Sequence, residues 1–402
     1  LFADDTSLFT VVYDEEIAAD QLNKDLKIIS EWAYQWKMQF NPDVTKQAIQ
    51  VIFSQKKVKP EHPLVYFNES PVIIKEEQKH IGMILDSGLN FRSHVRAKII
   101  SAKRGIGVIR YLSKYVTRDV LDQMYKLYVR PHFDYGDIIY HKYDPDMNLE
   151  LTKKLESIQY SAALAVSGAW RGTNKSKLYE ELGWEYLYHR RWYRRLIHFF
   201  KVRQKQFPLY LYNLIPPERH VDYNLRRSNV FEQRIERTAR FSNTYIQNCV
   251  KEWNLLDISI RSCQTISEFK RKLIQWVRPP KRSIFNIYNL KGIKLLTQLR
   301  VEFSDLRNHR YRHNFNCANP SCSCKTGIED NEHFLLHCPR FSSQRRVLFD
   351  LVSKSVNIDI MRLSSRELCH LLLYGNSDIN IVTNRAIIES TLSYIKNTKR
   401  FK

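Results

Sequence analysis

The feature that most restricts the fold of this 402-residue chain is a group of cysteines and histidines near its C-terminal end. Cys322, Cys324, His333 and Cys338 follow the spacing Cys-x-Cys-x8-His-x4-Cys within 17 residues. Three thiolates and one imidazole form a complete tetrahedral ligand set for Zn²⁺. A segment this short buries little apolar surface, so metal binding would drive its folding. We therefore predict a structural zinc site, which by itself indicates no particular activity.

The sequence leaves the choice of ligands open. Cys317 is an alternative to Cys322 or Cys324, and His337 is an alternative to His333. The remaining cysteines are scattered along the chain. This distribution favours a metal site in a reducing compartment over a framework of disulfides.

The net charge is +22 at pH 7 and is unevenly distributed. Residues 1–45 carry nine acidic and three basic side chains, so the rest of the chain is strongly basic. Such a basic body predicts a polyanionic partner, most simply nucleic acid. No apolar run approaches the roughly 18 residues that a membrane-spanning helix needs. We expect no membrane partner and an intracellular location.

Hydrophobic periodicity predicts an α+β chain that is mostly helical. A helix should begin after Asp14, a favourable N-cap, and run to about Met38. Short strands are expected within residues 48–85. The further helices are expected at 96–111, 117–129, 148–169 and 184–205, with breaks at Pro131 and Asp144-Pro145, and two or three more should follow Cys338.

The helix expected at 184–205 has two different sides. Trp192, Leu196 and Phe199 share one side, which we expect to lie in a core. The other side is basic, and basic residues interleaved with aromatic ones suit phosphate contact and base stacking. The residues predicted to contact nucleic acid are Arg190, Arg191, Arg194, Arg195 and Lys201.

Two carboxylates, Asp4 and Asp5, lie between short apolar runs at the start of the chain. This pattern is typical of a hairpin that presents both acids at its tip. Paired carboxylates there can hold Mg²⁺ for chemistry on phosphates. Lys46 follows a helix-breaking Asn41-Pro42 and is a candidate proton donor to a departing pyrophosphate. Taken singly, these residues fit an ordinary turn and a surface lysine better than they fit a catalytic site.

The ordered set of motifs resembles the reverse transcriptases of non-LTR (LINE-type) retrotransposons. Phe2-Ala3-Asp4-Asp5 resembles their [FY]-x-D-D motif, and the cysteine spacing matches the zinc knuckle near their C-terminus. Segment 36–46 is similar to the block that follows that motif, and segment 80–86 is similar to a strand bordering the primer. Segments 237–243 and 253–257 are similar to stretches of jockey-like elements.

This resemblance implies part of a right-hand polymerase. Residues 1–95 would form a partial palm, 96–185 a helical thumb, 186–310 a basic helical linker region, and 311–402 the CCHC knuckle with C-terminal helices. The implied reaction is target-primed, RNA-templated DNA synthesis with two Mg²⁺ ions at Asp4 and Asp5, and with Lys46 as the proton donor. The implied partners are template RNA, a DNA primer or target, and dNTPs in a complete enzyme, in a ribonucleoprotein of nucleus and cytoplasm.

In that family a third carboxylate and the fingers precede the [FY]-x-D-D motif, and the sequence in hand has no matching residues. We therefore expect a C-terminal fragment that is inactive on its own. The alternative is a non-catalytic nucleic-acid-binding protein that uses the basic helix and the zinc knuckle.

Overall fold

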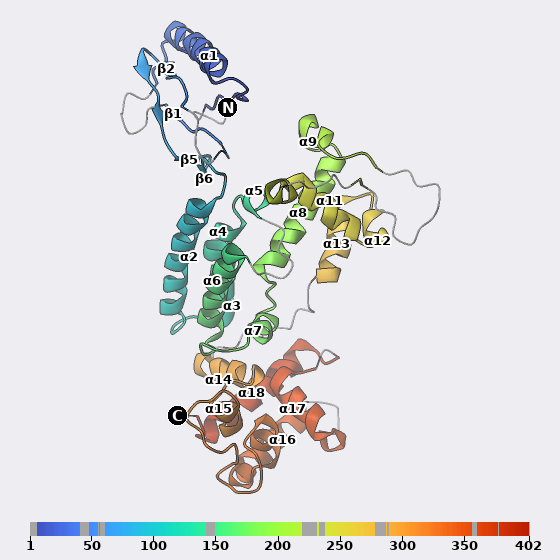
Figure 1. Cartoon of the computed structure of the whole chain (residues 1–402). Coiled ribbons are helices and arrows are strands. Elements are labelled where there is room, and N and C mark those ends of the chain that lie inside the picture. The colour runs from blue at the N-terminus through green and yellow to red at the C-terminus, as the bar shows by residue number, and fades with distance from the viewer. Residues whose placement is uncertain are drawn as a thin grey trace. The chain divides into compact units, whose positions relative to one another are not determined.

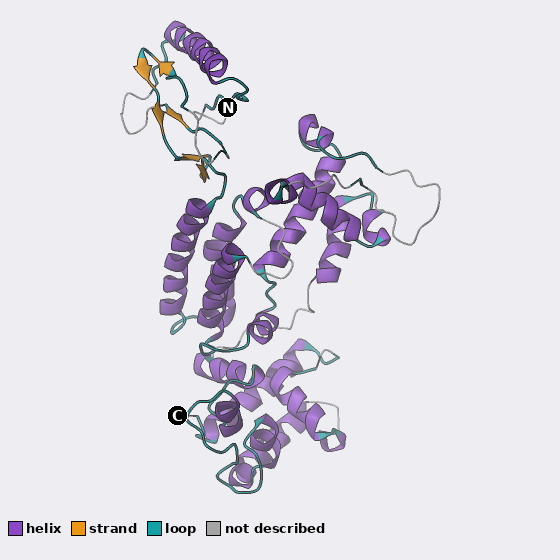
Figure 2. Cartoon of the chain, in the orientation of Figure 1, coloured by secondary structure: helices purple, strands orange, loops and turns teal. Residues whose placement is uncertain are grey.

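The computed structural model describes residues 6–40, 48–54, 56, 61–141, 149–218, 231–232, 238–277, 287, 289–355, 360–376 and 378–401. They divide into two compact units, Leu1–Lys98 and Ile99–Lys402, which are described separately here. Figure 1 traces the elements along the chain, and Figure 2 shows that helices predominate, as predicted. Within the described ranges, no helix combines the length and apolar composition needed to cross a membrane.

The first unit contains one long helix, α1 (Glu15–Gln35), which begins where the sequence predicted. Asp14 is its N-cap, and the Asp14 carboxylate accepts a hydrogen bond of 3.0 Å from the Ile17 amide. The core beside this helix is small and centres on Ala19, Val65 and Val72. Large apolar side chains of α1 remain exposed, including Trp32 at 49%.

The strands of this unit are short and form three separate pairs among the described residues. Strands β1 (Ile49–Gln50) and β4 (Ile73–Ile74) pair in parallel. The antiparallel pairs are β2 (Tyr66–Phe67) with β3 (Ser70–Pro71), and β5 (Glu77–His80) with β6 (Met83–Asp86). Strands were therefore predicted in the right region, but they are shorter than the apolar runs suggested.

Helix α2 (Arg92–Leu112) leads into the second unit, whose named elements in the described ranges are all helices or helical turns. Its other elements are α3 (Arg118–Met124), the π-helical turn η2 (Tyr125–Val129), α4 (Arg130–Asp134), α5 (Asp137–Tyr140), α6 (Glu150–Ser167), α7 (Lys175–Leu182), α8 (Leu187–Arg203), α9 (Leu209–Asn213), α10 (Ala239–Ser242), α11 (Tyr245–Leu255), α12 (Ile258–Arg261), α13 (Ile266–Val277), α14 (Leu290–Arg300), α15 (Arg307–Arg312), the turns η3 (His333–His337), η4 (Pro339–Phe341) and η5 (Ile360–Arg362), α16 (Ser342–Ser355), α17 (Ser365–Tyr374) and α18 (Ile381–Asn397).

The break predicted at Pro131 does not occur, because helical structure continues to Asp134. Proline has no amide hydrogen to donate and crowds the preceding turn. The chain accommodates it with the π-helical turn η2, in which the Arg130 amide bonds to the Tyr125 carbonyl. Pro131 then lies in the first turn of α4, where its missing donor costs little.

Two of the apolar cores among the described residues of the second unit bear on the predicted sites. One joins α8 to α11 and α13, which lie side by side in Figure 1. Phe200 stacks on Phe269 there with ring centroids 4.5 Å apart, and Leu196 and Phe199 are fully buried. This confirms that the apolar side of the predicted 184–205 helix lies in a core. The other core joins α14, α16, α17 and α18 around Phe334 and includes Cys322 and Cys338.

A buried ion network links α3, α7 and α14. One oxygen of Glu181 accepts hydrogen bonds of 2.8 Å from both Arg118 and Arg300. Arg118 also donates to the hydroxyl of Thr297 at 3.2 Å. Because these residues are far apart in sequence, the network fastens the C-terminal core to the helices that precede it.

Candidate metal centre and basic surfaces

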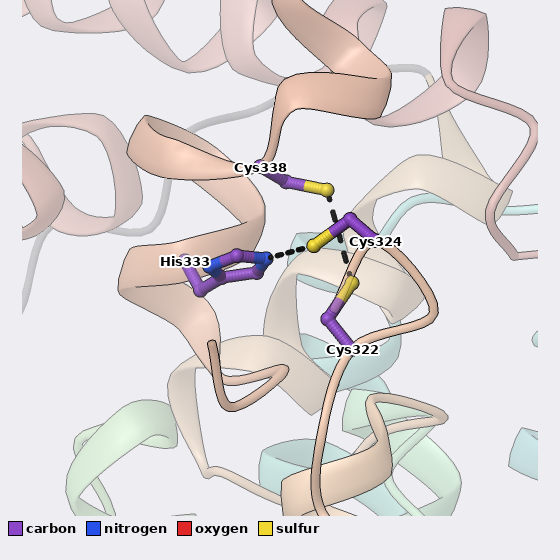
Figure 3. Close-up of side chains that lie close together, drawn as sticks. All are labelled: Cys322, Cys324, His333 and Cys338. Atoms are coloured by element: carbon purple, nitrogen blue, oxygen red, sulfur yellow. Dashed lines mark hydrogen bonds between the residues drawn. The ribbon is translucent and has the colours of Figure 1, made fainter. Parts of the chain in front are cut away.

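Four side chains predicted as zinc ligands converge in the C-terminal core. Figure 3 shows Cys322, Cys324, His333 and Cys338 pointing toward one another, and their ligand atoms all lie within 4.8 Å of one another. The Cys322 and Cys338 sulfurs are 3.8 Å apart, and Cys324 Sγ lies 3.2 Å from His333 Nε2. Zn–S bonds of about 2.3 Å in a tetrahedron separate two sulfurs by about 3.8 Å. The arrangement therefore fits one Zn²⁺ ion.

Local backbone structure explains this convergence. Cys322 and Cys324 lie on a tight loop, which is closed by a 2.8 Å hydrogen bond from the Cys322 amide to the Gly327 carbonyl. His333 begins the π-helical turn η3, and its amide is capped by Asp330 at 2.8 Å. The Cys338 amide bonds to the His333 carbonyl at 2.7 Å, across five residues. This wider turn places side chains five positions apart on the same side.

The two alternative ligands lie outside this cluster. The Cys317 sulfur instead approaches the carbonyls of Arg307 and Asn319 at 3.5 and 3.3 Å. The His337 side chain is exposed and lies 3.3 Å from the Glu332 carboxylate. The geometry therefore favours the set Cys322, Cys324, His333 and Cys338 over the sets that include Cys317 or His337.

Two of these cysteines have pKa values that are shifted in opposite directions. Burial would raise the pKa of Cys324, but hydrogen bonds from Thr326 outweigh it and lower the pKa to about 6. Burial instead raises the pKa of Cys338 to about 12. Cys324 is thus ready as a thiolate, whereas Zn²⁺ would displace the proton of Cys338 on binding.

The arginines of α8 do not form the exposed basic face that we predicted. Arg190 pairs with Asp134 at 2.7 Å, and Arg194 pairs with Asp137 at 2.9 Å. Arg195 is only 1% exposed and donates two hydrogen bonds to Glu252.

Arg191 is also buried, with its guanidinium 5.7 Å from the centre of the Tyr140 ring. We therefore correct the expectation for these four arginines, because they neutralise and pack against the protein's own groups. Lys201, in the last turn of α8, is half-buried and stays a prediction.

A different basic surface was missed by the sequence argument and lies on α2 and the turn after it. The α2 sequence contains six basic residues and no acidic residue. In the second unit its exposed cations are Lys103, Arg104 and Arg110, followed by Lys114. None of them pairs with a carboxylate in the described ranges. The absence of acidic residues was a signal that could have identified this surface.

Aromatic rings accompany these cations. Tyr111 and Tyr115 are 66% and 64% exposed, and their ring centroids are 5.6 Å apart. On the opposite side, a Cβ added at Gly105 would lie 2.9 Å from Val129 Cγ2. The helix therefore packs tightly on η2 with one side and presents cations and tyrosines on the other. We call residues 103, 104, 110, 111, 114 and 115 the α2 basic surface.

The predicted magnesium site cannot be compared with the structure. Asp4, Asp5 and Lys46 all lie outside the described residues. Their roles therefore rest on the sequence motif alone.

Comparison with known proteins gives one informative relative. Over 188 residues, or 45% of its length, the chain is 28% identical to a protein of Drosophila melanogaster described as "Probable RNA-directed DNA polymerase from transposon X-element". The match covers 19% of that protein, so the chain spans about a fifth of its length. No family model and no solved structure matches the chain. The resemblance predicted from the motifs is confirmed: the chain is homologous to the RNA-directed DNA polymerase of a non-LTR retrotransposon.

Proposed function

We propose that this chain is the C-terminal, nucleic-acid-binding part of a retrotransposon reverse transcriptase. The observation that carries the proposal is the match to the X-element polymerase. The predicted regions then have defined roles: residues 1–95 contribute to the palm, 96–185 to the thumb, 186–310 to a linker, and 311–402 to the knuckle. The complete enzyme would copy RNA into DNA with dNTPs and Mg²⁺.

In this proposal Asp4 and Asp5 hold Mg²⁺, and Lys46 donates a proton to pyrophosphate. The motif in this sequence supplies two carboxylates, and a two-metal site needs more oxygen ligands than these. The 402-residue chain on its own is therefore expected to be inactive in polymerisation. Its own activity is to bind template RNA or a nucleic-acid duplex.

The zinc centre has a structural role in this proposal. Cys322, Cys324, His333 and Cys338 would fill all four positions of a tetrahedral ion, which leaves none for a substrate. The cluster is also embedded in the core formed by α16, α17 and α18. Zinc then stabilises the C-terminal region and fixes the loop on which Cys322 and Cys324 lie.

The α2 basic surface is the proposed contact for nucleic acid. Its cations are exposed and have no competing carboxylate on the same helix, so they are available to phosphates. Exposed tyrosines next to such cations allow stacking on bases or riboses. Three arginines of α8 instead pair with the protein's own carboxylates, Arg190 with Asp134, Arg194 with Asp137 and Arg195 with Glu252.

The test is RNA binding by variants of the full chain. Lys103→Glu with Arg110→Glu reverses two charges of the α2 basic surface. The matched control, Arg346→Glu with Arg366→Glu, reverses two exposed charges on α16 and α17. Fluorescence anisotropy at about 100 mM salt should show binding at least tenfold weaker for the α2 pair and little change for the control. Equal losses for both pairs would reject a specific role for α2.

A second function, a non-catalytic nucleic-acid-binding protein, is favoured by the exposed cations and the metal cluster. Neither feature depends on Asp4 or Asp5. Primer extension separates the two functions when the chain is supplied within a longer polymerase. Synthesis that is lost on Asp4→Ala supports the polymerase, whereas RNA binding without synthesis in that longer protein supports the second function.

A further inference from the structure

A positively charged hollow lies beside the zinc cluster. Its volume is about 360 Å³, and it is walled by the loop that carries Cys322 and Cys324, by η4 and by residues 398–400. The polar residues that line it are Arg307, Ser323, Glu329, Arg340, Thr398, Lys399 and Arg400. Four of the seven are cationic, and one is acidic.

The single carboxylate in the hollow is already neutralised. Glu329 is 2% exposed and receives two hydrogen bonds of 2.7 Å from Arg400 and one of 2.9 Å from the Arg307 amide. The side-chain cations of Arg307, Arg340 and Lys399 remain. None of these three pairs with a carboxylate in the part of the chain that the structure describes. The hollow therefore carries an excess of about three positive charges.

The metal cluster and the C-terminal tail together shape the hollow. Ser323 lies between two zinc ligands, and Arg340 follows Cys338 by two residues and donates a hydrogen bond to the Ser323 hydroxyl. Across the hollow, Arg400 also donates to the Asp305 carbonyl at 2.8 Å. Phe401 packs on Phe334, with ring centroids 5.4 Å apart. Both walls are thus anchored in the C-terminal core.

We propose that this hollow binds a phosphate group through Arg307, Arg340 and Lys399. Guanidinium groups offer paired N–H donors that match phosphate oxygens, and three cations around one small volume favour a multiply charged group. The proposal rests on the proposed function for the source of the phosphate, which is a nucleic-acid strand. That source is a phosphomonoester at a strand end or an internal phosphodiester.

The test uses the zinc-loaded full chain and two probes. Calorimetric titration with pyrophosphate measures the hollow directly. Anisotropy compares a single-stranded RNA that carries a 5′-phosphate with the same RNA that carries a 5′-hydroxyl. The variant is Arg340→Gln with Lys399→Gln, both exposed side chains. The control is Arg346→Gln, an exposed arginine outside the lining.

We expect the double variant to bind pyrophosphate about tenfold more weakly and the Arg346→Gln control to bind it as the unmodified chain does. If the double variant loses a preference for the RNA with the 5′-phosphate, the hollow is assigned to strand ends. If the double variant binds both RNAs more weakly to the same extent, the hollow is assigned to internal phosphates. Unchanged pyrophosphate affinity in the double variant, or equal loss in Arg346→Gln, would overturn the proposal. Pyrophosphate binding without any RNA binding would retain the hollow and reject the proposed function.

Discussion

The buried network around Glu181 allows a sharp prediction about stability. Glu181 is the shared carboxylate between Arg118 and Arg300, and its side chain is 2% exposed. The substitution Glu181→Gln keeps the size of the side chain but removes its charge. Two guanidiniums would then face each other in a buried site without a counter-charge. Removing one partner of a buried ion pair costs about 3–5 kcal/mol, because the other charge stays buried.

The pKa of Glu181 supports a similar stabilisation free energy for this network. Burial would raise this pKa, but Arg300 and Arg118 outweigh it and lower the pKa from 4.5 to about 2. A carboxyl group whose pKa is lower in the folded than in the unfolded state stabilises the fold at pH values above its unfolded-state pKa. That stabilisation, about 3 kcal/mol, is lost as the pH falls from about 4.5 to about 2. The difference in the free energy of unfolding between the unmodified chain and Glu181→Gln should therefore shrink over this acid range.

Urea denaturation at pH 7, followed by tryptophan fluorescence, measures the effect. We expect the midpoint of the second unit to fall by about 1 M in Glu181→Gln. The matched control is Glu302→Gln, whose exposed ion pair with Lys177 should contribute less than about 1 kcal/mol. Equal shifts for Glu181→Gln and Glu302→Gln, or a difference that persists unchanged at pH 3, would refute the reasoning.

Three further predictions concern the metal, the backbone and catalysis. Metal analysis should find one zinc per chain, and Cys322→Ser with Cys338→Ser should lose it, whereas undiminished zinc would reject the site. Gly168, at φ +71°, ends α6, so Gly168→Ala should destabilise the chain to urea by about 1–2 kcal/mol. Primer extension on RNA with Mg²⁺ and dNTPs should give no product with the 402-residue chain, and synthesis that is abolished by Asp4→Ala would contradict this.

Local signals in the sequence were sufficient for several elements. The Asp14 cap and the apolar spacing predicted α1, and the ligand spacing predicted the cysteine and histidine cluster. These predictions succeeded because the interactions involved lie within short stretches of sequence. The three helices that follow Cys338 were also expected from periodicity.

One failure arose from contacts between residues far apart in sequence. The basic side of α8 looked solvent-exposed because its partners, Asp134, Asp137 and Glu252, lie about 57 positions away. Helical periodicity cannot reveal which carboxylates will meet a basic face. Pro131 was misinterpreted for a different and local reason, since a π-helical turn can absorb a proline without ending the helix.

The salt dependence of RNA binding by the intact chain tests the central claim most directly. The proposed function requires several phosphate contacts, so affinity should fall by about two or more orders of magnitude between about 50 and 200 mM salt. The slope of log affinity against log salt should also decrease when charges of the α2 basic surface are removed. Absent RNA binding, or binding that is independent of salt, would contradict the account.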